Sequence, residues 1–517
     1  MFERSSGVLL HPTSLPGRYG IGDLGEAAYR FVDFLSDTEQ SLWQFMPLGP
    51  TGYGDSPYQS FSAFAGSPLL ISPDLLAAEG FLSVEELADV PDFPIDKVDF
   101  GWVINYKKEL LHKSFLHFES QATPEQKTFL EDFAKANSGW LPDYALFTAL
   151  KDYHGGAVWN TWESAIAHHE PAAVVEWTEK LATEVRYQVY LQFQFDRQWR
   201  SVKSYANNKG IKLVGDIPIF AAYDSADVWA HSDIFSLDED GQPTEVAGVP
   251  PDYFSTTGQL WGNPLYRWDE LAKQNYGWWL DRFRKTFELV DILRIDHFRG
   301  FAGFWAVPFG DATAENGTWR KGPGSALFEV VKAVLGDAPI IAEDLGFVTP
   351  DVRGLRLQFG FPGMKIIQFA FADDGTDPFL PHNHDPNSVV YTGSHDNDTA
   401  LGWYEKASPA EQHKARLYTN SSGQDFSWDL IRLTFSSVAN IAVVPLQDIL
   451  SLGNEARMNY PGSASGNWQW RFQPEMLTEE IRDHLKLVTQ LYARDKASVE
   501  KAAKRLTDNP VEGYDIL

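Results

Sequence analysis

The chain of 517 residues contains no cysteine, so disulfide bonds, thiolate nucleophiles and cysteine-based metal sites are excluded. No stretch approaches the ~18 consecutive apolar residues that a membrane-spanning helix needs. Residues 1–17 show neither a long apolar core nor the cleavage site of a signal peptide. These absences predict a cytoplasmic protein with no membrane partner.

Basic residues are scarce as well. The 43 lysines and arginines stand against 71 aspartates and glutamates, which gives a formal net charge of −28. A nucleic-acid-binding protein needs a basic face, so the charge predicts no nucleic-acid partner. With 44% hydrophobic and 22% charged residues, the composition is that of a folded globular chain. The sequence leaves the oligomeric state open.

Eight short apolar runs, bounded by turn residues, alternate with helical patterns along the chain. The runs are rich in valine and isoleucine and most are too short for helices, as expected of parallel strands that are buried on both faces. They lie at 6–12, 42–48, 211–220, 290–296, 338–344, 364–371, 387–396 and 440–447. This repeated alternation predicts an α/β protein of the (β/α)8 TIM-barrel class, in which the helix after the sixth run is missing.

Two segments interrupt the alternation. Residues 1–72 are predicted to form the first part of the barrel, and residues 73–188 carry several helical patterns that predict an inserted helical subdomain. After a barrel segment at 189–220, residues 221–265 are irregular and rich in glycine, proline and aromatic residues. A long irregular segment in a compact domain is usually functional, so we predict a loop region that lines a cleft. Residues 266–517 are predicted to complete the barrel and to end in helices.

An acidic residue stands at or near the end of four of the eight predicted strands. These residues are Asp216, Asp296, Glu343 and Asp396. Burying a carboxylate is costly unless it is paired or hydrogen-bonded, so four such placements indicate function. In a (β/α)8 barrel the carboxyl ends of the strands converge on one face, where the active site lies.

Convergent carboxylates and aromatic residues in turn-rich segments suit glycoside chemistry. One carboxyl must protonate the leaving oxygen, and a second must attack the anomeric carbon or activate water. Arg294 lies two residues before Asp296, so both side chains point the same way on a strand and the cation favours an ionised nucleophile. Glu343 has no basic neighbour in the sequence, so a raised pKa is expected there, which suits a general acid/base.

Three strand-end segments resemble the catalytic segments of the α-amylase superfamily, namely RIDHFRGF (294–301), AEDLG (342–346) and GSHDND (393–398). Four others are similar to segments of its 4-α-glucanotransferase family (amylomaltase, or disproportionating enzyme): HPTSLPG (11–17), GYGDSPYQS (52–60), GVPPDYFSTTGQLWGNPLY (248–266) and RMNYPG…GNWQWR (457–471). The similarity runs from about residue 5 to residue 495. It implies a barrel with helical insertions and without the C-terminal β-sandwich of amylases.

The resemblance also implies catalytic roles. Asp296 would be the nucleophile that forms a β-glucosyl-enzyme, with Arg294 orienting its side chain. Glu343 would be the general acid/base. Asp396, helped by His395, would hold the donor sugar and stabilise the transition state.

The remaining implied residues bind substrate or support the site. Asp216 would support the catalytic acids, and Ser56 and Tyr58 would bind donor glucose units. A mobile loop over the cleft would contain Asp252, Tyr253, Phe254, Gln259, Trp261 and Asn263.

The implied reaction is a retaining double displacement on malto-oligosaccharides and other α-1,4-glucans, and it requires no metal or organic cofactor. The 4-hydroxyl of an acceptor glucan replaces the leaving glucan, with Glu343 acting first as acid and then as base. Retention predicts that the carboxyl groups of Asp296 and Glu343 lie about 5–5.5 Å apart. Two alternatives stay open: an α-glucan hydrolase that uses the same acids, and a catalytically inert glucan-binding protein.

Overall fold

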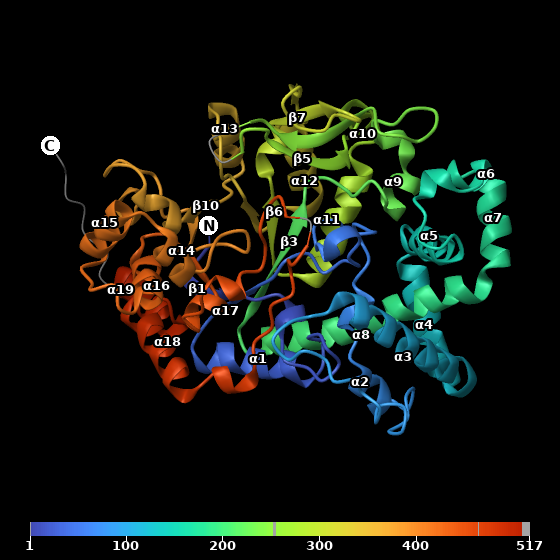
Figure 1. The fold of residues 1–517 in the computed structure, drawn as a ribbon, viewed down its shortest axis with the longest axis horizontal. Helices are drawn as coiled ribbons and strands as arrows, with labels where there is room; N and C mark the ends of the chain where they lie inside the picture. Colours follow the sequence, from blue (N-terminus) through green and yellow to red (C-terminus); the bar gives the residue numbers. More distant parts are fainter. Residues whose placement is uncertain (1, 252–254, 464, 509–517) are drawn as a thin grey trace.

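A computed structural model describes residues 2–251, 255–463 and 465–508 (Figure 1). In this part of the chain eight parallel strands form the central sheet, in the neighbour order β10-β11-β12-β1-β2-β3-β6-β9. They are β1 Ser5–Leu9, β2 Leu42–Gln44, β3 Lys212–Pro218, β6 Ile292–Asp296, β9 Ile340–Ala342, β10 Gly363–Ile366, β11 Ser388–Tyr391 and β12 Ile441–Pro445.

The sheet closes on itself between β9 and the segment before β10. The Ala342 N–H donates to the Pro362 carbonyl over 3.0 Å, which joins the two outermost strands of the neighbour order. Each of the eight predicted apolar runs overlaps one of these strands, with β1 and β10 beginning one residue before their runs, and nearly every strand residue is buried. Burial on both faces explains why the runs are continuously apolar and do not alternate with polar residues. The predicted (β/α)8 barrel is confirmed.

Helices follow most of the strands and cover the outside of the barrel (Figure 1). After β10 the chain makes only two 3-10 turns, at Ile367–Phe371 and Pro381–Asn383, so the helix that the sequence lacked is replaced by turns. The barrel helices are α1 Glu26–Asp37, α8 Ala182–Asn208, α11 Gly277–Leu289, α12 Ser325–Leu335, α13 Pro350–Gln358, α14 Ala400–Lys406, α15 Pro409–Thr419, α16 Phe426–Ser436, α17 Leu446–Ile449, α18 Glu479–Leu491 and α19 Lys496–Asp508.

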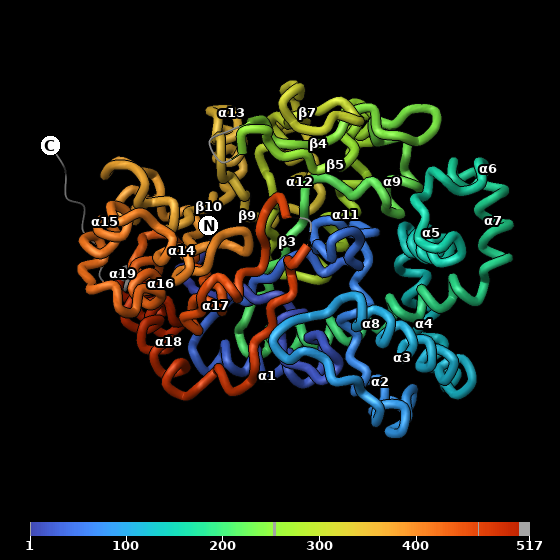
Figure 2. The backbone as a smooth tube through the Cα atoms, viewed as in Figure 1, coloured from blue at the N-terminus to red at the C-terminus, as the bar shows by residue number. Residues whose placement is uncertain are grey.

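The segment after β2 forms a helical insertion that stands to one side of the barrel, at the right of Figures 1 and 2. Local capping explains where two of its helices begin: the Asp99 side chain accepts from the Trp102 N–H, and Thr123 and Gln126 form a capping box. Its helices are α2 Pro73–Ala78, α3 Phe100–Gln121, α4 Pro124–Ala136, α5 Leu141–Tyr153, α6 Ser164–Ala167 and α7 Pro171–Lys180.

The predicted boundary between residues 188 and 189 falls inside α8, a helix of 27 residues. This helix begins among the helices of the insertion and ends directly before barrel strand β3. Insertion and barrel therefore share one continuous element.

The prediction of an irregular loop at residues 221–265 is wrong, because this segment contributes two strands and a helix to a second layer. Four antiparallel strands form a small sheet in the order β5-β4-β7-β8. Its β5 contains Gly262 with φ 76° and ends at Pro264, so it lacks a strand-like apolar pattern. The elements are α9 Ala226–Ala230, β4 Glu245–Val249, β5 Gln259–Pro264, α10 Trp268–Lys273, β7 Gly303–Pro308 and β8 Thr318–Lys321.

Among the described residues, none of the helices combines the length and the apolar character needed to cross a membrane.

A buried arginine ties the C-terminal helices to the bottom of the barrel. Arg494, which lies between α18 and α19, is 0% exposed. Its guanidinium donates to carbonyl oxygens over 2.8–3.3 Å, namely those of Phe435, Ser437, Ala439, Asn440 and Ser5. These carbonyls lie at the end of α16 and at the starts of β12 and β1, so one side chain satisfies acceptors from three elements.

We expect Arg494→Ala to destabilise the protein by about 3 kcal/mol, because it removes the charge-assisted hydrogen bonds of a fully buried guanidinium and leaves a cavity in its place. Arg4 still donates to the carbonyls of Phe435, Ser437 and Ala439, so the loss comes from the missing Arg494 side chain and not from unpaired carbonyls there. The midpoint of thermal unfolding measures this loss. Arg30→Ala is the matched control, since Arg30 is 69% exposed and its ion pair with Glu26 contributes little. Equal melting temperatures for the two variants would contradict the role given to Arg494.

Candidate active site

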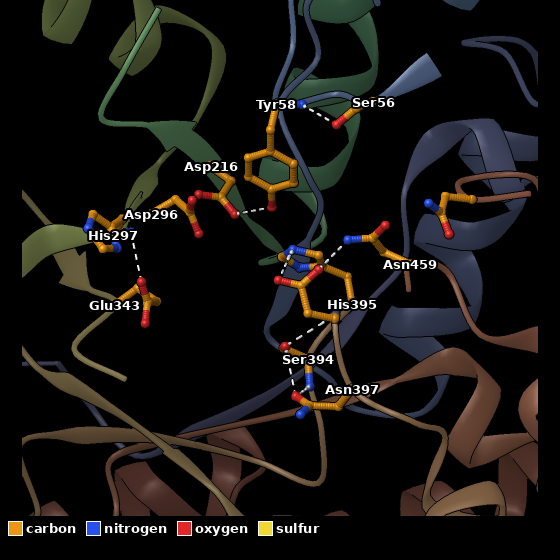
Figure 3. A network of polar contacts seen from close by, with 12 residues as sticks. Ser56, Tyr58, Asp216, Asp296, His297, Glu343, Ser394, His395, Asn397 and Asn459 are labelled. Carbon is orange, nitrogen blue, oxygen red and sulfur yellow. Dashed lines mark hydrogen bonds and ion pairs between the residues drawn. The ribbon is translucent and has the colours of Figure 1, made fainter. Parts of the chain in front are cut away.

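The four acidic residues lie at the carboxyl-terminal end of the barrel. Asp216, Asp296 and Glu343 are labelled in Figure 3. Asp216 lies near the end of β3, Asp296 is the last residue of β6, and Glu343 directly follows β9. In the register of the sheet Asp216 pairs with Arg294, and Ile295 pairs with Ala342, so three neighbouring strands deliver these carboxylates side by side. Asp396 comes from the loop that follows β11.

Arg294 occupies the centre of this group. Its guanidinium is 3% exposed and forms ion pairs with the Asp216 carboxylate and, from Nη1 to Oδ1 over 3.0 Å, with Asp296. Burial lowers the pKa of Arg294, but the two carboxylates outweigh it and raise that pKa well above its ordinary value. Asp296 therefore faces a permanent positive charge across this ion pair.

Asp216 lies behind Asp296 and is almost fully buried. Burial raises its pKa to about 6, although the Arg294 charge acts against this shift. The Tyr58 hydroxyl donates to Asp216 Oδ2 over 2.9 Å. Asp216 thus connects the cation at the centre with an aromatic ring that faces the site.

Glu343 is held by two backbone amides, one from the segment that follows Asp296 and one from its own loop. The His297 N–H donates to Oε2 over 2.7 Å, and the Leu345 N–H donates to Oε1 over 2.8 Å. His297 adopts a left-handed conformation with φ 52°, which turns its N–H toward the carboxylate directly after Asp296. Burial, followed by the charge of Asp296, raises the pKa of Glu343 to about 7. A carboxyl group with this pKa can donate and accept a proton near neutral pH.

Asp396 is surrounded by donors. Asn459 Nδ2 donates to Oδ1 over 2.6 Å, His395 Nε2 lies 3.4 Å from Oδ2, and Arg457 donates to the backbone carbonyl of Asp396 over 2.5 Å. Burial alone would raise the pKa of Asp396, but the His395 charge and the hydrogen bonds from His395 and Asn459 lower it below its ordinary value. For the same reason the pKa of His395 is raised despite its burial.

Three contributors to the site were missed by sequence reasoning: His297, Arg457 and Asn459. Arg457 also donates from Nη1 to Asp398 Oδ1 over 2.5 Å and from Nε to the Asn459 carbonyl over 2.7 Å, so it ties the 457–460 segment to the Asp396 loop. Both Arg457 and Asn459 stand in the RMNYPG segment, which is similar to a segment of the 4-α-glucanotransferase family. An arginine and an asparagine in a turn-rich segment were the available signal, but only the fold shows their partners.

The structure brings the two expected donor-binding residues to the same place. The Tyr58 ring stacks on the His395 ring with centroids 5.1 Å apart and tilts against Trp468 at 5.8 Å. Ser56 Oγ accepts from the Tyr58 N–H over 3.3 Å. Tyr58 therefore touches both the Asp216 and the Asp396 sides of the site (Figure 3).

Of the residues expected in the cleft loop, some contact the site and one is buried away from it. Trp261 packs edge-on against the His297 ring at 4.7 Å, and its Nε1 donates to Gln259 Oε1 over 3.1 Å. Asn263, by contrast, is buried, donating to the Ala221 carbonyl and accepting from Gln59 Nε2. The Asn263 amide therefore connects β5 to the segments around Ala221 and Gln59 inside the protein, and it is not exposed to solvent. Three further expected residues, Asp252, Tyr253 and Phe254, lie outside the described residues.

Within the described part of the chain, no group of three or more histidines, aspartates and glutamates is arranged to hold a metal ion. The arrangement instead pairs two carboxyl groups in different surroundings. Asp296 forms an ion pair with Arg294, and Glu343 has a pKa raised to about 7. One carboxyl group is suited to attack a carbon atom, and the other to move a proton.

A (β/α)8 barrel with such a pair of carboxylates at its carboxyl-terminal rim defines a carbohydrate-active enzyme that breaks glycosidic bonds. The family model described as 4-alpha-glucanotransferase matches residues 10–478, and the chain belongs to this family.

Individual relatives agree with this assignment over nearly the whole chain. The chain is 51% identical to a 4-alpha-glucanotransferase of Synechocystis sp., over 95% of this chain and 98% of the relative. It is 49% identical to that of Thermus thermophilus, over 95% and 99%. Among solved structures, an amylomaltase from Streptococcus agalactiae in complex with acarbose matches with a TM-score of 0.93 and 40% identity, over 96% of this chain and 100% of that chain.

We expect Arg294→Leu to destabilise the protein by about 3–5 kcal/mol, because it leaves the Asp216 carboxylate buried without its cation. Adding Asp216→Asn should restore part of the lost stability, since the buried charge is then removed with its partner. Melting temperatures of the single and double variants measure both steps. A double variant that melts no higher than Arg294→Leu would show that the ion pair is not the source of the loss.

Proposed function

We propose that the protein transfers segments of α-1,4-glucans to the 4-hydroxyl of glucose or of another glucan by a retaining double displacement. The observation that carries the proposal is the pair of acids at adjacent strand ends, Asp296 in an ion pair with Arg294 and Glu343 with a pKa of about 7. Membership in the 4-alpha-glucanotransferase family supports the substrate class. We propose malto-oligosaccharides as substrates, with no metal or organic cofactor.

In the first step Asp296 Oδ attacks C1 of a glucose unit while Glu343 gives its proton to the glycosidic oxygen. The bond between C1 and that oxygen breaks, the shortened glucan leaves, and a β-glucosyl ester of Asp296 remains. Arg294 orients Asp296 from the side of the barrel interior. The amides of His297 and Leu345 hold the Glu343 carboxyl next to it.

In the second step the 4-hydroxyl of an acceptor glucan gives its proton to Glu343 and attacks C1. The ester bond breaks, Asp296 is released as a carboxylate, and two inversions leave the α configuration unchanged. We propose that the carboxyl groups of Asp296 and Glu343 lie about 5–5.5 Å apart, as retention requires. Transfer exceeds hydrolysis when the acceptor reaches the ester before water does.

We propose that Asp396 and His395 hold the hydroxyls of the donor sugar whose C1 reacts. Both side chains lie beside Tyr58, which with Ser56 would bind donor glucose units. Asp216 supports the site through its contacts with Arg294 and Tyr58.

The loop residues are assigned to a cover over the cleft. Trp261 and Gln259 would contact substrate near His297, and Asn263 would support them from below. We keep Asp252, Tyr253 and Phe254 as proposed members of the same cover. The helical subdomain at 73–188 is proposed as an insertion in the catalytic barrel, and the cytoplasmic location stays a prediction from the sequence.

The purified protein is expected to convert maltotriose into glucose and into chains longer than maltotriose. A hydrolase would give only shorter chains, and an inert binding protein would leave maltotriose unchanged, so chromatography of the products separates the three hypotheses. Asp296→Asn should reduce turnover by at least about 10³-fold, because it removes the nucleophile. The circular dichroism spectrum should stay that of the parent, and retained activity would refute the role of Asp296.

The pH dependence follows from Glu343. The first step needs Glu343 protonated, and its pKa of about 7 means that the protonated fraction falls as the pH rises through 7. We expect kcat/KM for maltotriose to fall about tenfold per pH unit well above pH 7. Initial rates between pH 5 and pH 9 measure this, with circular dichroism at each pH as the control for folding. A kcat/KM that keeps rising up to pH 9 would contradict the assignment of Glu343 as the acid.

A further inference from the structure

Three side chains without a role in the proposed reaction meet beside the catalytic pair. The Arg299 guanidinium carbon lies 4.0 Å from the centroid of the Trp319 ring and 6.0 Å from that of the Phe347 ring. Arg299 Nη1 also donates to the Phe347 carbonyl over 2.7 Å. We call Arg299, Trp319 and Phe347 the rim platform.

Two members of the rim platform stand on the chain segments that directly follow the catalytic pair. Arg299 follows Asp296 by three residues, and Phe347 follows Glu343 by four. The two segments are cross-linked twice, by the bond from the His297 N–H to Glu343 and by the bond from Arg299 to Phe347. Since four residues span at most about 14 Å, the backbone of Phe347 lies within a few sugar units of the backbone of Glu343.

The platform is exposed and at the same time well supported. Phe347 is 72% exposed and Trp319 is 44% exposed, although large aromatic rings are usually more buried. Trp319 belongs to edge strand β8 and packs edge-on against Trp305 with centroids 5.2 Å apart. Trp305 in turn donates from Nε1 to the Ala314 carbonyl over 2.8 Å. The Trp319 ring, held in this way, loses little conformational freedom when a ligand stacks on it, and the backbone of Phe347 is tied to Arg299.

The chemistry of the platform matches a sugar chain. The Arg299 guanidinium covers one face of the Trp319 ring, and the ring surface of Trp319 and Phe347 that stays exposed is apolar, as is one face of a glucose ring. The guanidinium beside them is a donor group that suits sugar hydroxyls. Glu343 would give its proton to the oxygen of the leaving glucan and take one from the hydroxyl of the accepting glucan. The loop that begins at Glu343 is therefore expected on the side of the cleft where these two glucans bind.

We propose that the rim platform is a distal subsite for the leaving or accepting α-1,4-glucan, and that it makes the enzyme favour long chains over short ones. This inference rests on the proposed function for the direction in which the glucan runs. The proposal assigns a glucan as the ligand of Trp319 and Phe347, which lie outside the catalytic group.

The test compares kcat/KM for maltoheptaose with kcat/KM for maltotriose. Phe347→Ala should lower the ratio of the two about tenfold, as a loss of roughly 1.4 kcal/mol in binding would do. Trp319→Ala should lower it as well, and Trp319→Phe less, because a ring is kept. Phe129→Ala is the matched control, since Phe129 is 54% exposed on α4 in the helical insertion and should leave the ratio unchanged.

A ratio that stays at the parental value in both folded alanine variants overturns the proposal. If instead the sedimentation of these variants changes while the ratio does not, the exposed β8 edge is an interface between copies of the chain, and the proposal is overturned too. Failure of the proposed function is recognised separately, because the parent protein then makes no longer chains from maltotriose. In that case calorimetric binding of maltoheptaose must be weakened by Phe347→Ala, or the platform is not a glucan site.

Discussion

The site depends on the ion pairs that the buried guanidinium of Arg294 forms with Asp216 and Asp296. Three carboxylates on neighbouring strand ends repel one another strongly where water is excluded, and each would lose its hydration on burial. A permanent cation between Asp216 and Asp296 makes this arrangement tolerable. Glu343 has no such ion pair with Arg294, and burial beside Asp296 raises its pKa to about 7. The surroundings of the two acids thus differ in which one contacts the arginine.

The rest of the site is positioned by contacts between chain segments and not by any single element. Glu343 accepts from amides on either side of it, one of which follows Asp296 directly. Asp396 is fixed through Arg457 and Asn459, which arrive after the last barrel strand. Small displacements of either segment would change the distance between reacting groups, and such changes are costly in catalysis. The second sheet extends this frame outward and carries the aromatic rings of Trp261 and Trp319.

The barrel itself was predictable because each of its strands has a sequence pattern that can be recognised within a few residues. Parallel strands buried on both faces appear as short, continuously apolar runs, and a carboxylate at the end of such a run stands out. The second sheet was not predictable by the same means. Its β4 pairs with β7, which lies beyond an intervening barrel strand, and β5 carries Gly262 at φ 76° and ends at Pro264. Neither strand shows a periodic pattern, so the segment looked irregular.

The sequence by itself determined the order of the eight strands and the placement of acids at four strand ends, since both follow from patterns within a few residues. The tertiary structure decided which residues surround those acids. It placed Asn459 against Asp396, buried Asn263 beneath the loop that it was expected to line, and turned the His297 amide toward Glu343. These contacts join residues that are far apart in the chain. Burial, which raises the pKa of Asp216 and Glu343, is a property of all the elements packed around each of them.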